Sequence, residues 1–98
     1  MVKHMIIWKF KENSENTPKL AADIKSALEG LVGKIGGLES MKIITEKLSS
    51  SSGDIMMDSL FIDETALKNY QSHPLHLEIA KNLVKPYMEL RLSMDYEI

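Results

Sequence analysis

The chain has 98 residues, of which 44% are hydrophobic, 27% charged and 6% aromatic, as is typical of one globular domain rather than a fibrous or disordered chain. Its net charge of −2 argues against a nucleic-acid partner, because phosphate groups call for a basic surface. The lack of cysteine excludes disulfides, thiolate nucleophiles and cysteine-ligated zinc, and it fits a reducing compartment.

The first expected element is a strand over residues 2–10, which are rich in β-branched and aromatic side chains. Its two faces carry His4, Ile6, Trp8 and Phe10 on one side and Lys3, Met5, Ile7 and Lys9 on the other. Its apolar run, residues 5–8, is far shorter than the roughly 20 residues that cross a bilayer. Because no cleavage signal follows, we expect a cytoplasmic protein with no membrane partner.

The second expected element is an amphipathic helix over residues 18–34. Thr17 is the predicted N-cap, and Pro18 suits the first helical position. Three- and four-residue spacing of apolar side chains then places one stripe on the helix, formed by Leu20, Ile24, Ala27, Leu28, Leu31 and Ile35. Gly36 and Gly37 are expected to end the helix.

Two strands should follow, over residues 38–48 and 54–62. The serine-rich segment at residues 49–53 ends in glycine and is typical of a hairpin connection. Met41 and Ile43 lie on one face of the earlier strand, whereas Ile44 and Leu48 lie on the other.

The last third of the chain predicts a broken helix and a final strand. Asp63 can cap a short helix over residues 64–72, and Pro74 can begin another. The Lys85-Pro86 pair should end this helix, because a residue before proline resists the α conformation. Residues 87–98 then form the last strand, whose apolar face carries Leu90, Leu92, Met94 and Tyr96.

This order of elements predicts an α+β, ferredoxin-like fold spanning residues 1–98 as one domain. The β-α-β-β-α-β order, with the second helix broken at His73-Pro74, gives an antiparallel sheet with helices on one face. The uncovered face would expose Met5, Ile7, Ile44, Ile55 or Met56, and Phe61. Because exposed apolar surface of this kind marks an interface, we expect a homodimer in which two sheets close against each other.

Residues 70–76, which read Tyr-Gln-Ser-His-Pro-Leu-His, are the most informative for chemistry. Helical spacing directs both Tyr70 and His76 towards the sheet, and His4 joins them if its strand face is the one that faces the helices. Two interpretations stay open. In one, the pair are hydrogen-bonded core residues; in the other, they are an imidazole base beside a phenol that binds a carbonyl or enolate oxygen.

Other side chains complete a predicted pocket between the helices and the sheet. We expect His4, Trp8, His73 and Leu83 to line it. His73 and His76 are spaced like metal ligands, but no fixed third ligand accompanies them. We therefore expect no metal and no cofactor.

Several segments resemble stress-responsive A/B barrel domain (Dabb) proteins. These are residues 2–11, the Tyr-x-x-His-Pro-x-His pattern at residues 70–76, residues 84–86, and the closing residues 95–97. The resemblance covers essentially the whole chain. It implies a ferredoxin-like fold that dimerises through its sheets into an α/β barrel.

The same resemblance suggests a chemistry without proving one, because fold does not imply function. Some relatives are polyketide cyclases in which a tyrosine and the second histidine of the pattern carry an aldol-type ring closure. Those positions fall on Tyr70 and His76, and a first-strand histidine of these enzymes matches His4. Their third-strand pocket histidine has no counterpart here, where residues 54–58 read Asp-Ile-Met-Met-Asp.

Three functions remain for the chain at this stage. It could be a homodimer that binds a small molecule without catalysis. It could be an acid–base enzyme acting on a carbonyl or polyketide-like compound, with His76 as base and Tyr70 as the partner of the substrate oxygen. It could also be a structural, stress-protective dimer.

Overall fold

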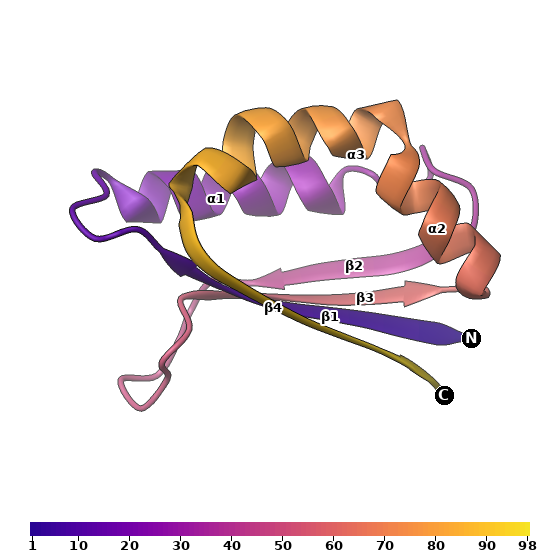
Figure 1. Ribbon diagram of the computed structural model, residues 1–98, viewed down its shortest axis with the longest axis horizontal. Helices are drawn as coiled ribbons and strands as arrows, with labels where there is room; N and C mark the ends of the chain where they lie inside the picture. The colour runs from indigo at the N-terminus through magenta and orange to yellow at the C-terminus, as the bar shows by residue number, and fades with distance from the viewer.

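The elements of the protein follow the predicted order in the computed structural model, which describes residues 1–98 (Figure 1). The four strands are β1 (Val2–Phe10), β2 (Leu38–Ile44), β3 (Ile55–Phe61) and β4 (Met88–Glu97). The three α-helices are α1 (Thr17–Glu29), α2 (Glu64–Ser72) and α3 (Pro74–Ile79). A π-helical turn (Ala80–Val84) and a 3₁₀ turn (Lys85–Tyr87) connect α3 to β4.

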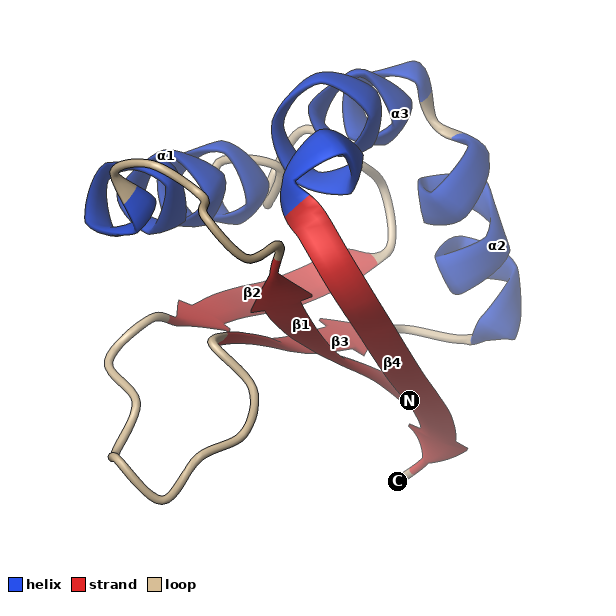
Figure 2. Cartoon of the chain, turned by 60° about the vertical axis from the view of Figure 1, so that its left-hand side comes forward, coloured by secondary structure: helices blue, strands red, loops and turns tan.

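The strands form one sheet in the order β2-β3-β1-β4, and every neighbouring pair is antiparallel. All the helices lie on one side of this sheet (Figure 2). The β2–β3 loop extends away on the opposite side (Figure 1). The prediction of an α+β, ferredoxin-like fold with helices on one face is therefore confirmed.

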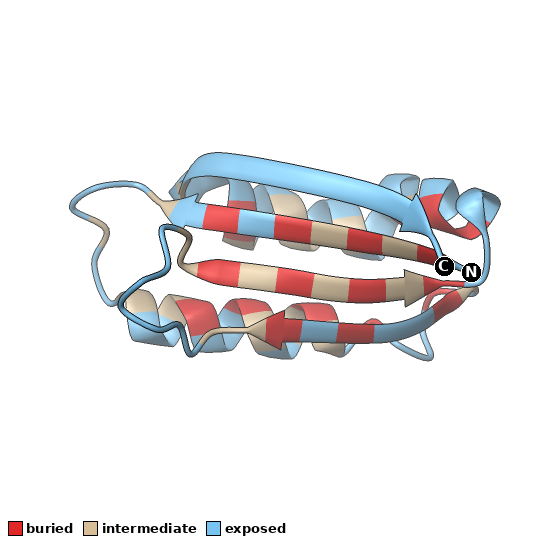
Figure 3. Cartoon of the chain, turned by 90° about the horizontal axis from the view of Figure 1, so that it is seen from below, coloured by how far each residue is buried: buried red, intermediate tan, exposed pale blue.

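The core lies between the helices and the inner face of the sheet. Along β1 every second residue is buried, beginning with Val2 and including His4, Ile6 and Trp8. The face of β1 with His4 is thus the one that faces the helices. Figure 3 shows the same alternation along β3, while β4 is exposed along nearly all its length.

Helix α1 ends at Glu29, earlier than predicted, and a series of turns continues to residue 37. Gly30 and Gly33 lower the helix propensity here, and Gly33 has a φ of +88°, which lies outside the helical region. Leu31 and Ile35 are nevertheless buried by these turns. The N-cap is Asn16 rather than Thr17, and no side-chain hydrogen bond caps the helix.

Strand β2 ends at Ile44, not at residue 48, because its last pair with β3 joins Ile44 to Met56. Asp54 secures the end of the connecting loop. Its backbone N–H donates to the Trp8 carbonyl oxygen (2.8 Å), and its carboxylate accepts from the Phe10 N–H (2.9 Å). These bonds attach the loop to β1.

The helix breaks where the sequence predicts, but α3 ends at Ile79 and only a π-helical turn continues it to Val84. Asp63 caps α2, where its carboxylate accepts a hydrogen bond from the Ala66 N–H at 2.8 Å. Helix α2 covers residues 64–72, and α3 begins at Pro74 after the extended residue His73. The break lets α2 and α3 run in different directions over the sheet (Figure 2).

The face of the sheet that bears no helix is called the open face below. Its apolar side chains come from all four strands and are Met5, Ile7, Ile44, Met56, Leu60, Leu90, Leu92, Met94 and Tyr96. Phe61 was predicted here, but it is fully buried on the helix side, as is Ile55. The prediction for Phe61 was wrong because the inward face of β3 consists of its odd-numbered residues.

Candidate functional site

A cavity of about 520 Å³ lies between the inner face of the sheet, α3 and the turns that follow α3. Nine of its 14 lining residues are hydrophobic, and Ile6, Trp8 and Val84 are among them. The remaining five are Gln71, His76, Lys85, Glu89 and Arg91. The cavity is thus an apolar space with a small number of polar groups, as in most small-molecule sites.

Local structure explains which side chains reach this cavity. Every second residue of β1 faces the helices, so Ile6 and Trp8 form the floor of the cavity. His76 and Ala80 are four residues apart and therefore share a face at the end of α3. The π-helical turn at Ala80–Val84 then shifts the register of the chain. Such turns occur often at functional sites.

The imidazole of His76 is half-buried on the cavity wall. Its Nδ1–H donates to the Gln71 carbonyl oxygen at 3.3 Å, which leaves Nε2 as the unprotonated nitrogen of the neutral ring. Burial is the main cause that lowers the pKa of His76 below 6.5; the charge of Arg91 acts in the same direction. Neutral imidazole is the form that can accept a proton.

Tyr70 lies directly behind His76, and the centroids of the two rings are 4.3 Å apart. Tyr70 is on the inward face of α2 with Ala66 and Leu67, and all three are buried. Burial raises the pKa of the Tyr70 phenol well above its ordinary value, so this group stays neutral and can donate a hydrogen bond. Its hydroxyl is buried without a hydrogen-bond partner.

The ring of His4 also lies close to Tyr70, so the three rings of His4, Tyr70 and His76 form a row. Its ring centroid lies 6.4 Å from that of Tyr70, and only 2% of the residue is exposed. The antiparallel register places Asp95 of β4 directly opposite His4, and the Asp95 carboxylate accepts a hydrogen bond from His4 Nδ1. The structure therefore brings His4, Tyr70 and His76 together.

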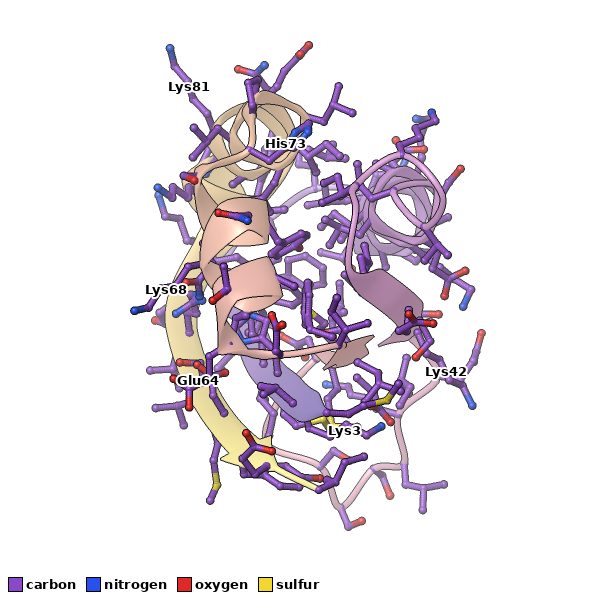
Figure 4. All side chains as sticks on the ribbon, turned by 90° about the vertical axis from the view of Figure 1, so that its right-hand side faces the viewer. Lys3, Lys42, Glu64, Lys68, His73 and Lys81 are labelled. Carbon is purple, nitrogen blue, oxygen red and sulfur yellow. The ribbon has the colours of Figure 1, made fainter.

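Three of the four residues predicted to line the pocket lie elsewhere. His4 is buried behind the cavity wall beside Tyr70 and is not a lining residue. His73 lies at the start of α3 (Figure 4) and caps it, because its Nδ1 accepts a hydrogen bond from the Leu75 N–H at 3.1 Å. Leu83 lies in a separate groove between α1 and α3 with Ala27 and Leu31. Trp8, in contrast, does line the cavity.

Four polar lining residues (Gln71, Lys85, Glu89 and Arg91) and the partner of His4, Asp95, were not predicted from the sequence. The alternation along β4 places Arg91 and Asp95 opposite its apolar face, which was the available signal. Their pairing with Trp8 and His4 depends on the register between β1 and β4, and that register is absent from the local pattern.

No group of three or more histidine, aspartate or glutamate side chains is arranged to hold a metal ion. No helix combines the length and the apolar character that crossing a membrane requires.

The fold and its cavity define an α+β protein of the ferredoxin-like class. Residues 2–98 match the model of the Dabb family, the stress responsive A/B barrel domain, and the chain belongs to this family. The resemblance noted in the sequence is thereby confirmed. Comparison with curated protein sequences gives no match.

Solved structures of similar fold include proteins with and without a named activity. A dimeric ferredoxin-like protein of unknown function from Bacteroides fragilis has a TM-score of 0.91 and 24% identity, with 99% of this chain and 95% of that chain covered. A Dabb family protein from Mesorhizobium loti has a TM-score of 0.76, 20% identity and the same coverage. Hydroxynitrile lyase from Passiflora edulis has a TM-score of 0.81 and 20% identity, with 99% and 92% covered.

We expect the imidazole of His76 to titrate reversibly in the folded protein with a pKa below 6.5, because burial and nearby cations disfavour its charged form. Since the unfolded chain then binds the proton more readily, the contribution of His76 to the free energy of unfolding falls as pH drops below about 6.5. NMR of the imidazole signals, assigned with His76→Gln, measures the pKa.

The substitution Arg91→Leu should raise the pKa of His76, because it removes a repelling cation. The matched control is Lys81→Leu, whose cation lies on the outer side of the helices and away from the cavity (Figure 4). A His76 pKa at or above the ordinary value in the unsubstituted protein would contradict this account.

Proposed function

We propose that this protein is a homodimer that binds a small organic molecule in the cavity between α3 and the sheet. The cavity itself carries the proposal. Its volume of about 520 Å³ lies within the roughly 300–1,000 Å³ typical of small-molecule sites. Its apolar walls would bury the body of a ligand, and its few polar groups would orient it.

The open face supports the homodimer. Ile7, Leu92 and Met94 are 43%, 59% and 67% exposed, and other apolar side chains surround them on all four strands. Apolar surface of this extent is typical of an interface. A structurally similar protein is described as dimeric. Two copies related by a two-fold axis would bury both open faces and close the two sheets into an α/β barrel.

The homodimer predicts a mass in solution of about 22 kDa, twice the chain mass of 11.1 kDa. Leu92→Arg should yield a folded monomer, because it places a charge on the open face without touching the core. Val32→Arg, on an exposed turn after α1, is the control and should remain dimeric. Sedimentation or light scattering distinguishes these species, and a wild-type monomer at micromolar concentration would refute the dimer.

Ligand binding can be measured with octanol, a neutral probe whose chain suits the apolar walls. Trp8 is the single tryptophan and lines the cavity, so its fluorescence should change as octanol binds. Ala80→Phe fills part of the cavity and should abolish the change. Ala22→Phe, on the exposed side of α1, should leave it intact. Equal responses from the two variants would contradict binding in this cavity.

A second candidate function is acid–base catalysis on a carbonyl compound. The row His4–Tyr70–His76 favours it, because it joins a neutral imidazole to a neutral phenol. Nε2 of His76 would remove a proton from the carbon beside the carbonyl and later return it. The Tyr70 hydroxyl would hydrogen-bond the enolate oxygen. Because Tyr70 lies behind His76, this role requires the wall to open there.

Deuterium exchange at the carbon beside the carbonyl of cyclohexanone tests this chemistry without a known substrate. We expect His76→Gln to slow the protein-dependent exchange at least about a hundredfold, as loss of a general base does. His73→Asn is the control, since asparagine preserves the cap of α3. If the wild-type protein gives no exchange above solvent, the catalytic candidate fails. If His76→Gln instead only lowers stability, the structural interpretation of His76 holds.

A further inference from the structure

The charges on the cavity wall are not balanced. Lys85, Glu89 and Arg91 are the lining residues that carry a formal charge, so two cations oppose one carboxylate. That carboxylate lies 3.8 Å from the ammonium group of Lys9, outside the lining set. Neither Lys85 nor Arg91 forms an ion pair with any carboxylate of the chain.

The position of Arg91 makes this imbalance informative. Arg91 pairs with Trp8 across the β1–β4 ladder, on the side of the sheet that faces the helices. Asp95, the next acidic residue along β4, is hydrogen-bonded to His4. Glu89 and Asp95, the two carboxylates of β4 near Arg91, are thus paired with other residues. The N–H donors of the Arg91 guanidinium are therefore unpaired, and the group lies beside the apolar residues that form the floor of the cavity.

We propose that Arg91, assisted by Lys85, selects a small amphipathic carboxylate as the ligand of this cavity. The planar guanidinium presents paired N–H donors that match the two oxygens of a carboxylate. The apolar body of the ligand lies against Ile6, Trp8 and Val84. This inference rests on the proposed small-molecule function and narrows its ligand to an anion.

Such a ligand also accounts for the arrangement of the other polar groups. His76 lies on the same wall in its neutral form, so Arg91 and Lys85 supply the positive charge that a ligand carboxylate would meet. Gln71 supplies an uncharged amide on the wall. Lys85 and Arg91 are therefore the cations of the cavity, and nine of the other lining residues are hydrophobic.

The test compares octanoate with octanol, which differ in the charged end and share the apolar chain. Trp8 fluorescence and calorimetry give the affinity of each probe. The ratio of octanoate affinity to octanol affinity should favour octanoate in the wild-type protein. It should fall at least about tenfold in Arg91→Leu, because charge-assisted hydrogen bonds are lost while the apolar wall remains. Lys81→Leu should leave this ratio unchanged.

The outcomes separate this inference from the proposed function. If octanol binds and Arg91→Leu leaves the ratio unchanged, small-molecule binding stands and selection of an anion by Arg91 is refuted. If neither probe binds the wild-type protein, both proposals fall. Arg91 is exposed on β4, so its variants should fold, and Arg91→Gln provides a second, polar variant with the same expected loss.

Discussion

The rest of the structure depends on the side-chain alternation of β1 at the centre of the sheet. This strand pairs with both β3 and β4, so its two faces define the two sides of the protein. Towards the helices it contributes His4, Ile6 and Trp8, which supply a polar partner for β4 and the floor of the cavity. Towards the open face it contributes Met5 and Ile7. A shift of one residue would exchange these roles.

The two faces of β4 have opposite chemistry, which separates the proposed dimer interface from the proposed ligand cavity. One face carries apolar side chains and belongs to the open face, whereas the other carries Arg91, Ser93 and Asp95. Asp95 offsets the burial of His4 by accepting its hydrogen bond. The Tyr70 hydroxyl has no such partner. A buried donor without an acceptor costs about 1–3 kcal/mol.

Local patterns were sufficient for the order of elements and part of the site. Proline and capping residues specify the break between α2 and α3, because they act on the backbone within one turn. Helical spacing likewise directed Tyr70 and His76 to the same interior, where their rings lie 4.3 Å apart. The ends of α1 and β2 were less predictable, since glycine weakens a helix gradually and a strand ends where its partner does.

Only the tertiary structure decided which groups meet across the sheet. It placed Phe61 in the core, because the inward face of β3 depends on pairing with its neighbours. It set Asp95 beside His4 and Arg91 on the cavity wall through the register of β1 with β4. The sequence by itself determined the elements and their apolar stripes, since these follow from interactions between near neighbours. Register and packing join residues far apart in the chain, and their outcome depends on all the strands together.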